Sequence, residues 1–232
     1  MKIKYPYLAK NVIPITNIRV KKAKGIKLWD TKNKTYIDFS SQTLNLSLGN
    51  SPEILIKAFK KQFSKYSFLS TRFIGDSFIT LSKEIVEIAP KGLNKVNIKL
   101  TNGSDANESA IKRARIYRKK PYIVSFYLSH IGETSETLNA SKKLTEAFFG
   151  GSNYFILIRS PFEKNNSEQK TLKKIESLFK TRNDIAAIII EPVMVNAGVY
   201  IFSKYFLKKL RTLCNKYKVT LIFDEIQTAY GW

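Results

Sequence analysis

Two short stretches of the sequence carry residues that could bind a charged small molecule. The first is Thr101-Asn102-Gly103-Ser104-Asp105, where an apolar run ends and a helical pattern begins. Glycine lets a ligand approach the backbone closely, and the first N–H groups of a helix favour a phosphate dianion. Ser104 adds a hydroxyl group and an N–H. The stretch predicts a phosphate site; the alternative is an ordinary turn with a serine cap.

The second stretch is Leu221–Gln227, in which an apolar run leads directly into Asp224 and Glu225. Ligands of parallel sheets bind outside the carboxyl ends of the strands, where Asp224 would emerge partly shielded from water. A carboxylate in that place is unfavourable unless it meets a cation or several hydrogen-bond donors. A protonated pyridine nitrogen would be such a cation. The alternatives are a helix-capping aspartate and a structural ion pair.

The elements that must position these stretches predict an α/β fold of three layers with a mostly parallel sheet. From Ser51 onward, helical patterns alternate with short apolar runs, as in repeated strand-helix-strand units. The expected strands are Val96–Leu100, Tyr122–Tyr127, Tyr154–Ile158, Ile185–Ile190 and Val219–Phe223. A first helix is expected directly after Ser51-Pro52. Further helices are expected at Ser77–Ala89, Ser104–Lys119, Thr171–Lys180 and Ser203–Tyr217. Residues 18–39 are expected to form a hairpin around a polar turn.

The composition is typical of a globular protein and not of a membrane or disulfide-rich one. The 232 residues are 44% hydrophobic, which is enough for a sizeable core. The longest apolar run, Ile185–Ile190, is too short to span a bilayer, and the N-terminus lacks the apolar stretch of a signal peptide. Cys214, the single cysteine, lies in an apolar helical pattern and is expected to be a core thiol. We therefore expect a soluble, cytoplasmic protein.

The charge balance raises a second class of function. The chain has 40 basic and 18 acidic residues, a formal net charge of +22, which would suit nucleic acid or an anionic membrane surface. The lysines are scattered along the whole length, however, without zinc-finger spacing or an RNA-binding aromatic signature. We expect a solvated basic surface with no specific nucleic acid and no membrane as partner. A basic nucleic-acid-binding protein is the minor alternative.

Four motifs, in order along the chain, resemble those of class III aminotransferases, which depend on pyridoxal 5'-phosphate (PLP). They are the entry hairpin at Leu28–Ser40, the phosphate-cup helix at Thr101–Lys112, the Glu-Pro strand end at Ile188–Val199 and the pyridine-binding segment at Leu221–Thr228. The resemblance implies an incomplete aspartate-aminotransferase-like fold (PLP fold type I). Residues 1–50 would then belong to the small domain, and residues 51–232 to the first part of the large PLP-binding domain.

The same resemblance implies a role for each residue of the two stretches. Gly103 and Ser104 would bind the cofactor phosphate, Asp224 would pair with the pyridinium nitrogen, and Gln227 would hydrogen-bond the phenolic oxygen of the ring. No metal is implied. The implied activity is transamination between an amino donor and a 2-oxo acid, by a parent enzyme expected to be a homodimer. The similarity is greatest to members that act on ω-amino groups with pyruvate or 2-oxoglutarate.

Two positions depart from the family pattern. The family usually has an aromatic residue followed by His, Gly, any residue and Thr. An alignment without a gap puts His130 in the aromatic position, where it would stack on the cofactor, and puts Ile131 in the position of the family's histidine. A one-residue insertion would instead keep His130 as the family's histidine and put Ser129 in place of the ring. Both alignments place His130 beside the cofactor. Asn196 stands where the family frequently has a glutamate that bridges to a substrate-gating arginine.

The chain ends at Gly231-Trp232, before the strand whose lysine forms the Schiff base in this family, and Trp232 takes the usual place of an arginine. No lysine in the chain matches that strand, so no catalytic residue is assigned and the chain alone is expected to be inactive. Three interpretations stay open. The chain is a truncated aminotransferase, a catalytically dead remnant or subunit that still binds PLP or a partner, or the scaffold of a sister chemistry such as an aminomutase, racemase or decarboxylase.

Overall fold

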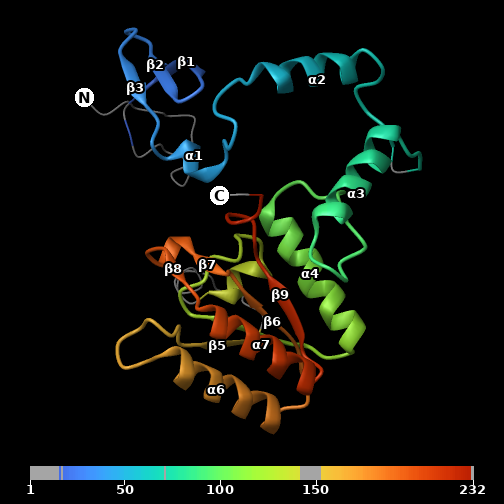
Figure 1. The fold of residues 1–232 in the computed structure, drawn as a ribbon, viewed down its shortest axis with the longest axis vertical. Helices are drawn as coiled ribbons and strands as arrows, with labels where there is room; N and C mark the ends of the chain where they lie inside the picture. Colours follow the sequence, from blue (N-terminus) through green and yellow to red (C-terminus); the bar gives the residue numbers. More distant parts are fainter. Residues whose placement is uncertain (1–15, 17, 71, 142–152, 231–232) are drawn as a thin grey trace. The chain divides into compact units, whose positions relative to one another are not determined.

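The computed structural model describes residues 16, 18–70, 72–141 and 153–230. They fall into two compact units, Met1–Ile88 and Ala89–Trp232 (Figure 1). All described side chains that are buried belong to the second unit, and so do all the predicted cofactor-binding residues. The division at residue 50 that the family resemblance implies concerns the domains of a complete enzyme and stays a prediction.

The first unit contains a small antiparallel sheet followed by helices that bury no side chain. Its elements are β1 (Val20–Lys24), β2 (Lys27–Asp30), β3 (Thr35–Ile37), α1 (Ser41–Leu44), α2 (Glu53–Phe63) and α3 (Asp76–Ile88). The expected hairpin is confirmed as β2 and β3, and β1 pairs with the other edge of β2. The carboxylate of Asp30 accepts the N–H groups of Lys32 and Lys34 at 2.8 and 2.9 Å, which closes the polar turn.

The second unit is built on a four-stranded sheet in the order β5-β4-β6-β9, in which every pairing is parallel. The strands are β4 (Tyr122–Phe126), β5 (Phe155–Ile158), β6 (Ile185–Ile190) and β9 (Thr220–Phe223). The helices are α4 (Gly103–Arg118), α6 (Glu168–Thr181) and α7 (Lys204–Lys216), with the 3-10 turns η2 (Thr137–Ala140) and η3 (Val195–Ala197). A short antiparallel pair, β7 (Val193–Met194) and β8 (Tyr200–Ile201), follows β6. The α/β fold with a parallel sheet is confirmed.

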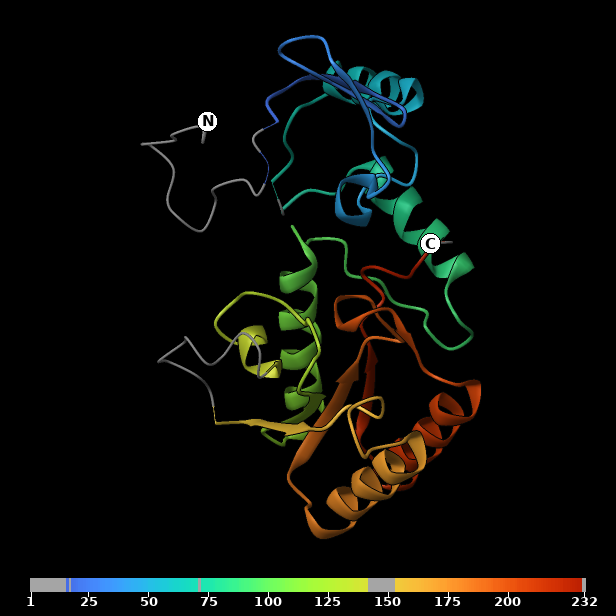
Figure 2. The same ribbon diagram turned by 90° about the vertical axis from the view of Figure 1, so that its left-hand side faces the viewer.

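Helix α4 covers one face of this sheet, and α6 and α7 cover the other (Figure 2). On the α4 face, Ile111 packs in one cluster with Ala187 and Ile189 of β6. On the opposite face, Ile188 packs in a second cluster that includes Phe206 of α7. Every residue of β6 is buried, because helices cover both sides of the strand. The continuous apolar run in the sequence is therefore the sign of a central strand.

The strand expected at Val96–Leu100 is wrong. In the part of the chain that the structure describes, this segment forms no strand pairing. Its side chains do alternate, because Val96, Ile98 and Leu100 are half-buried and the residues between them are exposed. A strand also needs a neighbour that receives its backbone hydrogen bonds, and a local apolar pattern carries no information about that neighbour.

The single cysteine lies in the core of the second unit. Cys214, on α7, is fully buried in the cluster that α6 and α7 form with the sheet, and burial raises the pKa of its thiol to about 12. The prediction of a core thiol is confirmed. Among the described residues, no helix is both long and apolar enough to cross a membrane.

The central position of β6 leads to a stability prediction with a matched control. We expect Ile188→Ala to lower the free energy of unfolding by about 2–5 kcal/mol, because it removes three carbon atoms from a side chain that is 0% exposed. Ile116→Ala makes the same change on α4 at a side chain that is 70% exposed, and it should alter stability by less than about 0.5 kcal/mol. Urea denaturation followed by circular dichroism measures both. Equal effects would contradict the assignment of the core.

Candidate functional site

One pocket of about 490 Å³ lies at the carboxyl edge of the parallel sheet, next to the N-terminus of α4. Its lining includes all five residues predicted to bind the cofactor, namely Gly103, Ser104, His130, Asp224 and Gln227. These residues come from three segments that are far apart in the sequence. The strand order brings His130 and Asp224 to one edge because β4, β6 and β9 are neighbours and run in the same direction. Helix α4, which contacts β6 and β9, brings Gly103 and Ser104 to the same pocket.

The N-terminus of α4 is shaped by a cap and a glycine. Asn102 caps the helix, because its side-chain oxygen accepts the N–H of Asp105 at 3.0 Å, so the alternative of a serine cap is wrong. Gly103 and Ser104 therefore lie in the first turn, where N–H groups have no partner within the helix. A Cβ at Gly103 would lie 2.8 Å from Cδ1 of Ile226, so a larger residue would displace that side chain. The pocket thus has a helix N-terminus as one wall.

The loop after β4 packs tightly against this first turn. Ser104 Oγ accepts the N–H of Glu133 at 3.1 Å. Gly132 has a φ of +148°, which L side chains rarely adopt, and a Cβ there would lie 2.8 Å from Ser104 Oγ and 2.4 Å from Thr137 Oγ1. Glycine is needed at this position for both its backbone angle and its lack of a side chain.

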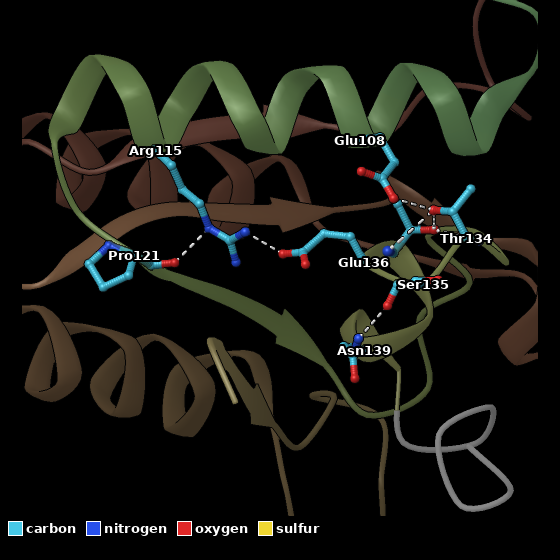
Figure 3. Close-up of polar contacts among 8 residues, drawn as sticks. Glu108, Arg115, Pro121, Thr134, Ser135, Glu136 and Asn139 are labelled. Atoms are coloured by element: carbon cyan, nitrogen blue, oxygen red, sulfur yellow. Dashed lines mark hydrogen bonds and ion pairs between the residues drawn. The ribbon is translucent and has the colours of Figure 1, made fainter. Parts of the chain in front are cut away.

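Two further contacts fasten the same loop to α4 (Figure 3). Thr134 Oγ1 donates to Glu108 Oε1 at 2.6 Å. Arg115 forms an ion pair with Glu136 and donates from Nε to the carbonyl oxygen of Pro121 at 2.7 Å. The side chain of Arg115 is about three-quarters buried, and these partners offset the cost of removing its positive charge from water. One helix therefore fixes the loop at several points along its length.

Asp224 is buried at the end of β9, with 6% of its surface exposed. Its Oδ2 accepts from Asn107 Nδ2 at 2.7 Å, and its Oδ1 accepts from the N–H of Ile226 at 3.1 Å. None of the ion pairs between described residues includes Asp224, so the alternative of a structural ion pair finds no support there. Burial raises the pKa of Asp224, and the donors from Ile226 and Asn107, with the nearby His130, oppose the rise.

A second buried carboxylate stands beside the first. Glu191 follows β6 directly, as Asp224 follows β9, and it is 5% exposed. Its Oε1 accepts the backbone N–H of His130 at 2.8 Å. Burial raises the pKa of Glu191 to about 7; the His130 hydrogen bond opposes the rise, and the negative charge of Asp224 adds to it. The pocket therefore holds two carboxyl groups whose proton affinities depend on each other.

The remaining predicted positions differ in their relation to the pocket. Gln227 is half-buried and lines it, whereas Asn196 is exposed on η3 and is not among the lining residues. Ser129, which the alignment with an insertion would place against the cofactor, is buried and does not line the pocket. Trp232 lies outside the described residues.

Comparison with known proteins identifies the family of this chain. Residues 7–232 match the family model described as Aminotransferase class-III. The chain belongs to the class III aminotransferases. It is 33% identical over 220 residues to 5-aminovalerate aminotransferase DavT of Pseudomonas aeruginosa, covering 90% of this chain and 51% of that protein. The chain spans about half the length of the curated relatives it matches, and that half is their N-terminal portion.

Solved structures of aminotransferases match the fold as well. A transaminase from the marine bacterium Virgibacillus aligns with a TM-score of 0.85 and 26% identity, covering 97% of this chain and 54% of that one. The taurine:2-oxoglutarate aminotransferase of Bifidobacterium kashiwanohense, solved in complex with PLP and glutamate, aligns with a TM-score of 0.82 and 28% identity, covering 90% and 50%. The expected fold type I is therefore confirmed for a part of that fold, and the family depends on PLP.

Neither Glu191, which lines the pocket, nor Asn107, which hydrogen-bonds to Asp224, was singled out from the sequence as a site residue. Glu191 carries the same signal as Asp224, an acidic residue directly after an apolar strand. Asn107 lies three residues beyond Ser104, on the same face of α4, but a polar residue on a helix gives no sign of the partner it meets.

The buried carboxyl of Glu191 should make the stability of this class III chain depend on pH. The pKa of Glu191 is about 7 in the fold and 4.5 ordinarily, so its contribution is fully present below about pH 4.5 and is lost as the pH rises through about 7. Glu191→Gln cannot ionise. We expect this variant to exceed the wild type in stability by about 1–3 kcal/mol near pH 8, with the difference vanishing near pH 4.5. Urea denaturation without added cofactor measures it, and parallel pH profiles for the two proteins would contradict it.

Proposed function

We propose that the pocket binds PLP and that this chain supplies the phosphate and pyridine sites of an enzyme that transfers an amino group between an amino donor and a 2-oxo acid. The observation that carries the proposal is Asp224, a buried carboxylate that lines the pocket and takes part in none of the ion pairs between described residues. Such a group suits a ligand that brings a positive charge to the same place. A protonated pyridine ring does so.

Another part of the pocket lining suits the phosphate of the same molecule. The N–H groups of Gly103 and Ser104 begin α4, and the partial positive charge of a helix N-terminus stabilises a dianion. The absence of a side chain at Gly103 leaves the backbone accessible to phosphate oxygens. The residues present therefore fit PLP at both of its charged ends.

Two other side chains would orient the ring between these ends. His130 lines the pocket and Ser129 does not, which supports the alignment in which the imidazole of His130 stacks on the ring. Gln227 would donate to the phenolic oxygen of PLP without adding a second negative charge beside Asp224. Glu191 would hold His130 in place by accepting the backbone N–H of His130.

Bound PLP supplies a protonated ring that withdraws electrons from the substrate carbon where a bond is broken. The contribution of Asp224 is to keep the proton on the pyridine nitrogen by stabilising the charged form of the ring. The turn around Gly103 would hold the phosphate so that the ring cannot slide away from Asp224. The described part of the pocket has no lysine in its lining, and we propose that the residue that links covalently to PLP is not among these 232.

The donor and the assembly are part of the same proposal. Two of the relatives are named for 5-aminovalerate and taurine, whose amino groups are at the end of a short chain. We propose an ω-amino compound as the donor and a 2-oxo acid as the acceptor. The whole enzyme would act as a homodimer in the cytoplasm.

The PLP site can be tested by binding alone. We expect Asp224→Asn and Ser104→Ala each to weaken PLP binding at least about tenfold, because each removes a charged or hydrogen-bonding partner of the ligand. Asn196→Ala, at an exposed position outside the pocket, should leave the affinity unchanged and serves as the control. Equilibrium dialysis with PLP gives the dissociation constants. Equal affinities of all four proteins would refute the site.

A separate experiment addresses catalysis by the chain alone. We expect no transamination and no covalent PLP adduct, because a surface lysine has neither the position nor the lowered pKa that Schiff-base chemistry needs. PLP is added, the protein is reduced with borohydride, and its peptides are mapped by mass spectrometry. Stoichiometric labelling of one lysine, together with spectral changes on addition of an amine, would show that the chain is an enzyme by itself.

A further inference from the structure

Asn107 is a buried polar residue next to the pocket, and the proposed roles leave it unexplained. It lies on α4, is 4% exposed and makes two hydrogen bonds from one amide nitrogen. Nδ2 donates to the backbone carbonyl oxygen of Ile131 at 2.7 Å and to Oδ2 of Asp224 at 2.7 Å. The amide therefore joins three separate segments: the helix, the loop after β4 and the end of β9.

We propose that Asn107 is a positioning residue for the PLP site, which orients the carboxylate of Asp224 and sets its distance from the phosphate-binding turn. The proposal rests on the proposed function of the pocket. It assigns to Asn107 no contact with the cofactor, because Asn107 is not among the residues that line the pocket.

The orientation of Asp224 depends on donors to both of its oxygens. The N–H of Ile226 holds Oδ1 from within the same turn, and Asn107 holds Oδ2. Without the amide, Oδ2 would be a buried acceptor that lacks this donor, and the carboxylate could rotate about its Cβ–Cγ bond. The amide is also neutral. Arginine or lysine in its place would pair with Asp224 and compete with the pyridinium.

The spacing of the site follows from the helix. Ser104 and Asn107 lie three residues apart on α4, so a rise of about 4.5 Å along the helix axis, slightly less than one turn, separates the phosphate donors from the donor to Asp224. Asp224 itself lies 117 residues further along the chain than Asn107. The hydrogen bond between them ties Asp224 to the helix that carries the proposed phosphate-binding turn, in addition to the path through the sheet.

The charged groups around Asp224 make this donor important for its ionisation. Glu191 at the end of β6 and Glu225 next in the chain are acidic, and His130 faces Asp224 from the loop. Burial and the neighbouring carboxylates favour protonated Asp224, whereas Asn107 favours the ionised form. An ionised Asp224 is the form that stabilises a protonated pyridine.

The test uses two adjacent substitutions on α4 in the purified protein. Asn107→Leu keeps the approximate size of the side chain and removes both donors. Glu108→Leu removes the acceptor that holds Thr134, so it loosens the same loop without touching Asp224. The pKa of Asp224 is measured without cofactor, from the 13C signal of its carboxyl group in NMR titrations, with Asp224→Asn used to assign the signal. Equilibrium dialysis then gives the affinity for PLP.

We expect Asn107→Leu to raise the pKa of Asp224 above its wild-type value and to weaken PLP binding by about tenfold. Glu108→Leu should not raise that pKa, because it removes a negative charge. Should Asn107→Leu fail to fold, Asn107→Asp preserves the shape and places an acceptor opposite Oδ2, so the upper of the two apparent pKa values of the carboxyl pair must exceed the pKa of Asp224 in the wild type.

An unchanged pKa of Asp224 in Asn107→Leu, or a rise of equal size in Glu108→Leu, would overturn the positioning role. The titration is made without PLP, so it separates this proposal from the function of the pocket. A wild type that does not bind PLP would refute the proposed function, while the titration would still decide whether Asn107 controls Asp224.

Discussion

A carboxylate that is buried without a cation is stable only where several donors converge on it, and Asp224 imposes this requirement on the second unit. The donors come from the turn after β9 and from α4 on the neighbouring face of the sheet. Helix α4 must therefore lie close to the ends of the strands. The cluster that includes Ile111, Ala187 and Ile189 allows this, because alanine on β6 leaves room for the helix. Packing and electrostatics thus depend on the same approach of helix to sheet.

The same helix serves the pocket along much of its length. Its first turn presents the N–H groups of Gly103 and Ser104, and its second turn presents Asn107. Further along, Glu108 and Arg115 hold the loop that carries His130 (Figure 3). Because these contacts share one rigid element, a displacement of α4 would alter the phosphate end, the pyridine end and the stacking position together.

The sequence predicts the parts of this arrangement that depend on local pattern. The apolar runs of β4, β6 and β9 and the acid that follows β9 place Asp224 at the correct edge, and the glycine before Ser104 marks the helix start. It does not predict contacts between distant segments. Val96–Leu100 has a strand-like pattern but no strand partner among the described residues. The sequence around Asn107 likewise does not indicate that its side chain hydrogen-bonds to Asp224. Pairing and partner choice are tertiary properties, which composition and periodicity do not encode.

The separation of 117 residues between Asn107 and Asp224 has a consequence for how the protein forms. Helix α4 can form locally, but the pocket exists after the parallel strands have paired, and such non-local pairing is slow. During synthesis, the phosphate-binding turn emerges long before the segment that carries Asp224. A ligand that needs both ends would therefore bind the completed fold and none of its precursors, and it would stabilise that fold by mass action.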